Sequence, residues 1–320
     1  MGAHCVTRTM FSVGLAGLAV VGLAPPSWAR ARALDTDGIT VHCVNVTMAD
    51  SRYSDCQDQH STIQDAVNHA ESGEMVLVGF GLYDEQVNIT KALTLEGAGA
   101  TMTTIQPAMV VPNTTSLFSG ALIAAIVLVD GAVDVTLKDL AVDGMVAAFH
   151  ACSPGYVGIF YRASSGAITD THVTNIHDPA TAGCQGRLAI FVQSGNGGPG
   201  LNSRVMITHN QVDVYGKNGI TANEPGTFVT VSDNTVMGRG ATFLGDAAQN
   251  GVQIGFGARG LVSHNTITGH DYAPMDFVAC GLLFFQAGGG LGRAKDNMFA
   301  ANEQDICTAG VGPSPHSPFN

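Results

Sequence analysis

The chain has 320 residues, of which 45% are hydrophobic and only 12% charged, and its formal net charge is −12. This composition argues against general disorder, because the chain can bury a large core. The net charge and the lack of Lys/Arg clusters argue against a nucleic-acid partner, since phosphate contacts need such clusters. Anionic glycans are also disfavoured unless a cation or a local basic patch intervenes.

Residues 1–31 are predicted to be a secretory signal peptide. Arg8 supplies positive charge, residues 11–24 are nearly all apolar, and residues 27–33 contain overlapping small-x-small cleavage motifs. The rival interpretation is a membrane anchor, but the run is shorter than the roughly 20 residues that a bilayer span needs. We expect a secreted, periplasmic or extracellular protein without a transmembrane anchor after cleavage.

The next segment, residues 32–60, is polar and is expected to be irregular, and a short helix is predicted over residues 61–70. Its apolar residues have helical spacing: Ile63, Ala66, Val67 and Ala70. Ser61 and Gln64 have the spacing of a capping box. Short apolar runs then follow at close intervals between residues 75 and 95, which is typical of buried parallel strands.

These elements carry a resemblance to a known family. The segment STIQDAVNHAESGEMVLVGFGLYDEQVNITKALTLEGAGATMTTI resembles the N-terminal cap and first coil of the pectin-lyase-like superfamily, and NGVQIGFGARGLVSHNTITGH is similar to its middle coils. The resemblance implies an all-β fold, a right-handed parallel β-helix over residues 61–307 with a short capping helix. Residues 308–320 are expected to be a disordered tail. The superfamily includes lyases, hydrolases, epimerases, esterases and passive adhesins, so the resemblance does not fix the reaction.

An asparagine recurs after Asp or His at the end of four short apolar runs. The four are Asn210, Asn234, Asn265 and Asn297, separated by 24, 31 and 32 residues. Such a period predicts stacked coils. Asparagine tolerates positive φ at a sharp turn, and amides at the same turn of successive coils can hydrogen-bond to one another. We therefore predict a structural ladder rather than a catalytic or metal-binding row.

The cysteines are predicted to form disulfides. Six of the seven remain once Cys5 leaves with the signal peptide, an even set in an exported chain. Coils stack about 4.8 Å apart, which matches the Cα separation of roughly 4.4–6.8 Å in a disulfide. The expected pairs are Cys43–Cys56, Cys152–Cys184 and Cys280–Cys307, and the alternative is six buried thiols. The sequence has no CxxC or Cys/His spacing that would predict structural zinc.

The third strand of each coil is predicted to have one buried and one outer face. Alternation points five apolar residues inward: Ile159, Ile190, Ile220, Val252 and Leu282. The outward residues are rich in amides and aromatics, and the resemblance implies that a polysaccharide or oligosaccharide lies along this face. The predicted substrate-binding residues are Phe160, Arg162, Phe191, Gln193, Asn223 and Gln253. The alternative is that long loops cover the phenylalanines.

The resemblance also suggests a base and an acid. Lyases of the superfamily remove the proton next to a uronate carboxyl group with Lys or Arg, often with the help of Ca²⁺. Lys217 and Arg239, about one coil apart, are similar to such a pair. If Ca²⁺ takes part, Glu224 and Asp246 are its candidate ligands. The alternative for each is an ordinary solvated charge.

Two His-Asp pairs in predicted long loops are further catalytic candidates, His177-Asp178 and His270-Asp271. Gly269-His270-Asp271 is also a faint echo of the Gly-His-Gly motif of polygalacturonase-type hydrolases. The Asp-Asp pair of that type is absent from this chain, which argues against that hydrolysis.

Three functions follow from the sequence. The first is a polysaccharide lyase that cleaves a uronate glycan by β-elimination. The second is a non-catalytic glycan-binding or surface protein. The third is an enzyme of small-molecule metabolism, with an apolar pocket under the loops near Phe160, Phe191 and Phe285.

Overall fold

The computed structural model describes residues 38–46, 56–144, 151–178, 183–195, 202–288 and 293–309. The predicted signal peptide lies outside the described residues, as does residue 310 onward of the predicted tail. Within the described ranges, no helix is long and apolar enough to cross a membrane.

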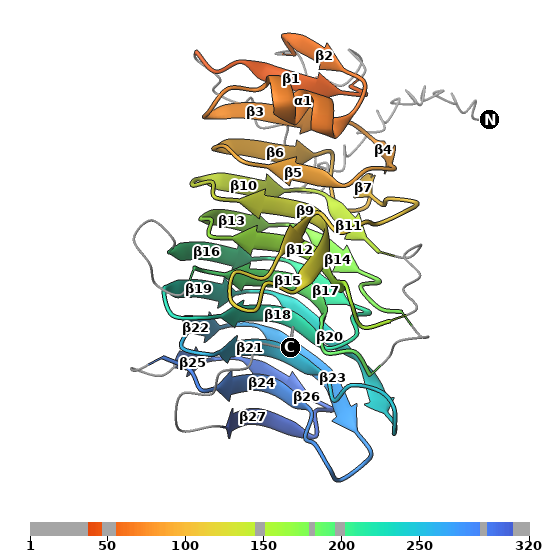
Figure 1. The fold of residues 1–320 in the computed structure, drawn as a ribbon, viewed down its shortest axis with the longest axis vertical. Coiled ribbons are helices and arrows are strands. Elements are labelled where there is room, and N and C mark those ends of the chain that lie inside the picture. The colour runs from red at the N-terminus through yellow and green to blue at the C-terminus, as the bar shows by residue number, and fades with distance from the viewer. Residues whose placement is uncertain are drawn as a thin grey trace, which may run out of the picture. The chain divides into compact units, whose positions relative to one another are not determined.

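The described chain forms three sheets whose strands stack coil upon coil (Figure 1). Sheet A contains, in spatial order, β2 (Asp58–His60), β1 (Val41–Val44), β3 (Glu74–Val78), β6 (Leu93–Gly97), β10 (Val135–Lys138), β13 (Gly166–Thr169), β16 (Ser203–Thr208), β19 (Thr227–Ser232), β22 (Arg259–Ser263) and β25 (Arg293–Lys295).

Sheet B contains β4 (Gly81–Tyr83), β7 (Thr103–Ile105), β11 (Ala141–Asp143), β14 (His172–Thr174), β17 (Gln211–Asp213), β20 (Thr235–Thr242), β23 (Thr266–Tyr272) and β26 (Met298–Ala300). Sheet C contains β5 (Val87–Ile89), β9 (Leu122–Asp130), β12 (Gly155–Arg162), β15 (Arg187–Gln193), β18 (Asn218–Asn223), β21 (Asn250–Gly255), β24 (Cys280–Phe285) and β27 (Gln304–Ala309). The short β8 (Thr114–Thr115) pairs antiparallel with β9, and every other pairing among the described strands is parallel.

The chain visits sheets A, B and C in turn, so it forms the right-handed parallel β-helix that the sequence predicts. Parallel register places equivalent residues of successive coils above one another. In sheet C the predicted inward residues form one buried column: Ile159, Ile190, Ile220, Val252 and Leu282. Such columns of aliphatic side chains fill the interior and supply the main stabilisation of the fold.

The asparagine ladder occupies the turns between sheets A and B. The Asn234 Nδ2 donates to the Asn265 Oδ1 at 2.9 Å, and the Asn265 Nδ2 donates to the Asn297 Oδ1 at the same distance. Each amide also satisfies a backbone carbonyl of the preceding coil, as Asn234 does at Ile207. The strained residue of each turn is the one before the asparagine, as at Asp233, where φ is 61°. The predicted ladder of hydrogen-bonded asparagines is therefore confirmed. The positive φ, however, is adopted by the residue before each asparagine and not by the asparagine itself.

The N-terminal end departs from the sequence prediction in two ways. Residues 32–60 were expected to be irregular, yet they supply β1 and β2, because the disulfide and backbone pairing add them to the edge of sheet A. The helix α1 (Ile63–His69) begins after Thr62, whose Oγ1 accepts the Asp65 N–H at 3.0 Å. The predicted capping box of Ser61 and Gln64 is wrong, since the Glu85 carboxylate caps the first turn from another coil.

Three disulfides join the expected pairs. Cys43–Cys56, Cys152–Cys184 and Cys280–Cys307 have Cα separations of 5.9, 5.1 and 6.0 Å. The last of them ties β24 to β27, which ends at Ala309, two residues beyond the predicted domain boundary. The spacing of one coil in sequence therefore does place two cysteines within disulfide reach.

Candidate functional site

The first half of the predicted sugar-binding face is covered by protein. Phe160 and Phe191 point outward from sheet C as predicted, but both are fully buried, and their rings stack with centroids 4.7 Å apart. Ala121 packs against the same apolar cluster. Ala121 is the last residue of a segment, residues 113–121, that contains β8 and that we call the β8 segment. In Figure 1 this segment, drawn in yellow, crosses in front of the strands of sheet C.

The polar neighbours of the two rings hold the β8 segment in place. The Arg162 Nε donates to the Thr115 carbonyl at 2.8 Å, and its Nη1 pairs with Asp130 at 2.8 Å. The Gln193 Oε1 accepts the Leu117 N–H at 2.9 Å. The four predicted contacts at positions 160, 162, 191 and 193 therefore pack and pin a segment of this chain, so we no longer assign them to substrate.

The next two coils of this face carry a buried amide cluster. The Gln253 Nε2 donates to the Asn223 Oδ1 at 3.1 Å, and the Asn218 Nδ2 donates to the Gln253 Oε1 at 3.1 Å. Beside these bonds, three buried polar atoms have no hydrogen-bond partner in the described part of the chain: Thr221 Oγ1, Asn223 Nδ2 and Glu224 Oε1. Unsatisfied buried polar atoms are costly and often mark a place where water or a ligand binds.

Glu224 gives this cluster a titratable group. Burial raises the pKa of its carboxyl to about 7, while a hydrogen bond from Gln193 acts in the opposite direction. The sequence singled out Asn223 and Gln253 by alternation, but it treated Glu224 only as a metal ligand. We call Thr221, Asn223, Glu224 and Gln253 the outer-face cluster.

A second group of charged side chains comes from sheet B and from the segments that lead from it into sheet C. In this group His177, Arg239 and Asp246 act on one another electrostatically, and Lys217 is linked to them through the loop before β21. We call this group the loop cluster: His177, Lys217, Arg239 and Asp246. Gln249 links its parts, because its Oε1 accepts the Arg239 N–H at 2.9 Å and its Nε2 donates to the Tyr215 carbonyl. The Lys217 ammonium donates to the neighbouring Ala248 carbonyl. Lys217 thus attaches to the loop before β21 through its side chain, whereas Arg239 does so through its backbone N–H. No hydrogen bond within the described ranges joins the two side chains that the sequence analysis paired.

Burial sets the charge states of the loop cluster. It lowers the pKa of Lys217 to about 8. The pKa of His177 falls below its ordinary 6.5, first through burial and then through the positive charge of Arg239, with Asp246 opposing the shift. His177 is therefore neutral at neutral pH. The electrostatic contributions of Arg239 and Asp246 to His177 indicate that the three are close neighbours.

The loop cluster also has polar atoms that lack a partner within the described ranges: His177 Nε2, Arg239 Nε and Arg239 Nη2. The Nε and one terminal nitrogen of a guanidinium form the fork that binds a carboxylate with two parallel hydrogen bonds. A half-buried guanidinium whose fork has no partner in the described part of the chain is well suited to an anionic ligand group.

Comparison with known proteins concerns the fold. No protein-family model matches the chain, and no curated protein matches it in sequence. The structure is similar to pectin methylesterase PemA from Erwinia chrysanthemi, with 11% identity, a TM-score of 0.45, and 82% of this chain and 92% of that chain covered. It is also similar to the pectin methylesterase of Aspergillus niger, with 14% identity, a TM-score of 0.44, and coverages of 87% and 93%.

A third similar structure is a GH136 lacto-N-biosidase from Eubacterium ramulus, with 12% identity and a TM-score of 0.47. The match covers 84% of this chain and 57% of that chain. Identities this low transfer no residue role to the present chain, so its chemistry has to be argued from its own side chains.

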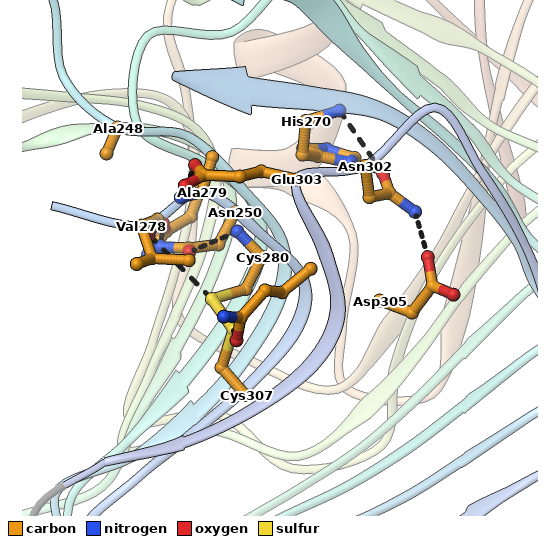
Figure 2. The surroundings of a disulfide bond; sticks show 12 residues. Ala248, Asn250, His270, Val278, Ala279, Cys280, Asn302, Glu303, Asp305 and Cys307 are labelled. Atoms are coloured by element: carbon orange, nitrogen blue, oxygen red, sulfur yellow. Dashed lines mark hydrogen bonds between the residues drawn. A yellow bond between two sulfur atoms is a disulfide. The ribbon is translucent and has the colours of Figure 1, made fainter. Parts of the chain in front are cut away.

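His270 does not fit the catalytic role predicted for it. Its ring is fully buried inside the coils; the Nδ1 is 2.8 Å from the Asn302 Oδ1, and the Nε2 contacts the Tyr215 hydroxyl. Figure 2 shows His270 directed at Asn302, on the coil that the Cys280–Cys307 disulfide closes. Burial lowers the pKa of His270 to about 4, so it is a neutral structural group. Its neighbour Asp271 is half-buried in β23.

The predicted Ca²⁺ ligands are too far apart to share an ion. Glu224 follows the end of β18, whereas Asp246 precedes the start of β21, and Asn218 pairs with Asn250 at the start of both strands. A strand of six residues is roughly 20 Å long at about 3.3 Å per residue. The prediction failed because the two residues lie at opposite ends of the neighbouring strands β18 and β21.

Proposed function

We propose that this protein binds a uronate-containing polysaccharide at the loop cluster and cleaves it by β-elimination. The observation that carries the proposal is the fork of Arg239, whose Nε and Nη2 lack a hydrogen-bond partner among the described residues, together with the electrostatic contact of Arg239 with His177. A uronate carboxylate would complete both hydrogen bonds of that fork. Lys217 and Arg239 also supply positive charge at this cluster, which an acidic chain needs in order to attract an anionic glycan.

The charge states suggest a separate catalytic role for each of Arg239, His177 and Lys217. Arg239 neutralises the uronate carboxylate, which acidifies the neighbouring C5–H bond. Neutral His177 takes the C5 proton, the C4–C5 double bond forms, and the C4–O bond breaks. Lys217, mainly protonated below its pKa of about 8, gives a proton to the leaving glycosidic oxygen. Atoms balance, and the products are an unsaturated uronate end and a new free hydroxyl.

The fold also favours a protein that works outside the reducing cytosol. The three disulfides would persist in an oxidising compartment and would hold neighbouring coils together there. Export is thus part of the proposal, since polysaccharides of this kind are extracellular substrates.

The test is a lyase assay on pectate, alginate and glycosaminoglycans, which reads the ultraviolet absorbance of the unsaturated product. We expect Arg239→Gln and His177→Gln to lower kcat/KM by about 100-fold or more, the usual range for a positioned acid–base or electrostatic group. Arg204→Gln is the matched control, because this arginine is exposed on sheet A over Phe228 and should leave the rate unchanged. Absence of product on all three glycans, or full activity in Arg239→Gln, would contradict the proposal.

A second candidate is glycan binding without turnover at the outer-face cluster. It is favoured by three buried atoms, of Thr221, Asn223 and Glu224, that have no partner within the described ranges and that neutral sugar hydroxyls could satisfy. The same glycans separate the two functions. Binding without product, unchanged in Arg239→Gln and lost in Glu224→Gln, would support this second candidate over the first.

A further inference from the structure

The N-terminal end of the coil stack contains a polar group where the interior columns should be apolar. His42 of β1 stands in register with Val76 of the next strand and with Asp58 of β2, and Val44 stands in register with His60. The side chains of both histidines are almost entirely buried, with exposures of 6% and 4%. Two imidazoles and a carboxylate therefore continue columns that elsewhere hold aliphatic residues.

The three ligand atoms form a nearly regular triangle. The His42 Nδ1 is 3.0 Å from the His60 Nε2 and 3.7 Å from the Asp58 Oδ2, and the His60 Nε2 is 3.4 Å from the same oxygen. Ligands at about 2.0–2.1 Å from a tetrahedral metal ion lie about 3.3 Å from each other. The three separations in this protein bracket that value.

The other ring nitrogens are held by carboxylates. The His42 Nε2 lies 2.9 Å from the Glu74 Oε2, which also accepts the Glu71 N–H at 2.6 Å. The His60 Nδ1 lies 2.9 Å from the Asp65 Oδ2. Because ionised carboxylates only accept hydrogen bonds, both of these nitrogens donate. This is the arrangement in which a carboxylate orients a metal-binding histidine.

The two remaining ring nitrogens, His42 Nδ1 and His60 Nε2, face each other. In neutral rings the His42 Nδ1 and the His60 Nε2 both carry lone pairs, and two lone pairs at 3.0 Å repel unless a cation or a proton lies between them. The facing pair is thus unexplained by hydrogen bonding between neutral side chains. Asp58 supplies a negative charge at the same point.

A neighbouring triad, His60, Asp65 and His69, shares one histidine but is a poorer site. The His69 Nδ1 already lies 2.9 Å from the Asp65 carbonyl of its own helix, and its side chain is 60% exposed. The His60 nitrogen on that side donates to Asp65. No nitrogen of that triad with a lone pair is directed at a common point with the others.

We propose that His42, His60 and Asp58 bind one divalent transition-metal ion of the Zn²⁺ class, with water as the fourth ligand. Two imidazoles and one carboxylate suit Zn²⁺ better than Ca²⁺ or Mg²⁺, which prefer oxygen ligands. The ion joins β1 to β2 next to the Cys43–Cys56 disulfide and so closes the N-terminal end of the coils. The site is structural and independent of the proposed lyase activity. The site could not be predicted from the sequence because the spacing of its ligands matches no zinc-binding motif.

The test uses the full exported chain, freed of metal with a chelator and titrated with Zn²⁺, with Co²⁺ as a spectroscopic probe. We expect one ion per chain, a tetrahedral Co²⁺ absorption spectrum, and a higher Tm with Zn²⁺. Asp58→Asn should weaken Zn²⁺ binding at least 10-fold while the fold is kept, because this side chain is 53% exposed. Glu74→Gln should weaken it 10- to 100-fold, as loss of an orienting carboxylate does.

His69→Asn is the matched control, a histidine of the same cap that the proposed site does not use, and it should bind Zn²⁺ like the wild type. A folded wild type that binds no Zn²⁺ and shows no Tm shift would overturn the proposal, and the facing imidazoles would then share a proton. Loss of binding in His69→Asn with full binding in Asp58→Asn would also overturn it, because the neighbouring triad would be the site.

Discussion

The burial and the pKa of Glu224 could not be predicted from its position in the sequence. It is 2% exposed, follows directly after β18, and takes a positive φ of 77°. One carboxylate oxygen lacks a partner in the described part of the chain. The sequence predicted a charged residue near the substrate face, but the raised pKa arises from burial, which only the packed coils produce.

The pH dependence of stability should report on Glu224. Its folded pKa of about 7 lies above the ordinary 4.5, so the folded state disfavours the ionised form. The contribution is neutral below about pH 4.5, becomes increasingly destabilising between about pH 4.5 and 7, and levels off above 7 at on the order of 2–3 kcal/mol. We expect Glu224→Gln to remove this loss in urea unfolding followed from pH 4 to 8, roughly the range of the titration.

The control for this measurement is Asp134→Asn, an exposed carboxylate on a turn with positive φ, which asparagine tolerates. It should keep the wild-type pH profile. If Glu224→Gln keeps that profile as well, the carboxylate is ionised without penalty and the outer-face cluster is solvated.

The β8 segment is the element that decides which part of the outer face is free. Asn113 anchors its start: the Nδ2 donates to the Ala125 carbonyl at 3.1 Å and to the Asn88 Oδ1 at 3.0 Å, and the Oδ1 accepts the Ala125 N–H at 3.0 Å. Gln193 holds its middle through Leu117 and Ser116. The segment is thus a pinned cover over Phe160 and Phe191.

Removal of the anchor should loosen the cover without unfolding the coils. We expect Asn113→Ala to speed hydrogen exchange of the Leu117 amide by about 10- to 100-fold, since loss of these bonds costs about 1–3 kcal/mol locally. Met109→Ala, at a side chain just before the segment that is 74% exposed, is the control and should change nothing. Equal exchange in both variants would mean that the stacked phenylalanines, and not Asn113, hold the segment.

Across the whole molecule, stability is distributed coil by coil. Each coil contacts mainly its neighbours, so a change at one end should not reach the other. Each of the three disulfides joins neighbouring segments. Cys43–Cys56 joins β1 to the residues before β2, Cys152–Cys184 joins the segments just before β12 and β15, and Cys280–Cys307 joins β24 to β27.

Removal of the terminal disulfide should therefore have a local effect. We expect Cys280→Ser with Cys307→Ser to cost about 2–4 kcal/mol, with faster hydrogen exchange confined to β24 and β27. The double variant Cys152→Ser with Cys184→Ser is the comparison and should affect the middle coils instead. Uniform loss of protection along the chain in either variant would show that the coils unfold as one cooperative unit.

The sequence by itself determined the coil architecture. The asparagine period, the alternation through Ile190 and Ile220, and the cysteine spacing are local or periodic signals, and stacking with parallel register converts them directly into position. They fix which residues point outward from each strand.

Tertiary structure alone decided what lies against those residues. Leu117 covers Gln193 from 76 positions away in sequence, and His42 meets His60 only because β1 and β2 pair. Arg239 and His177 likewise come together only because the coils that carry them are stacked. A side chain's burial, partners and pKa depend on such contacts between coils, and no periodic pattern in one strand encodes them.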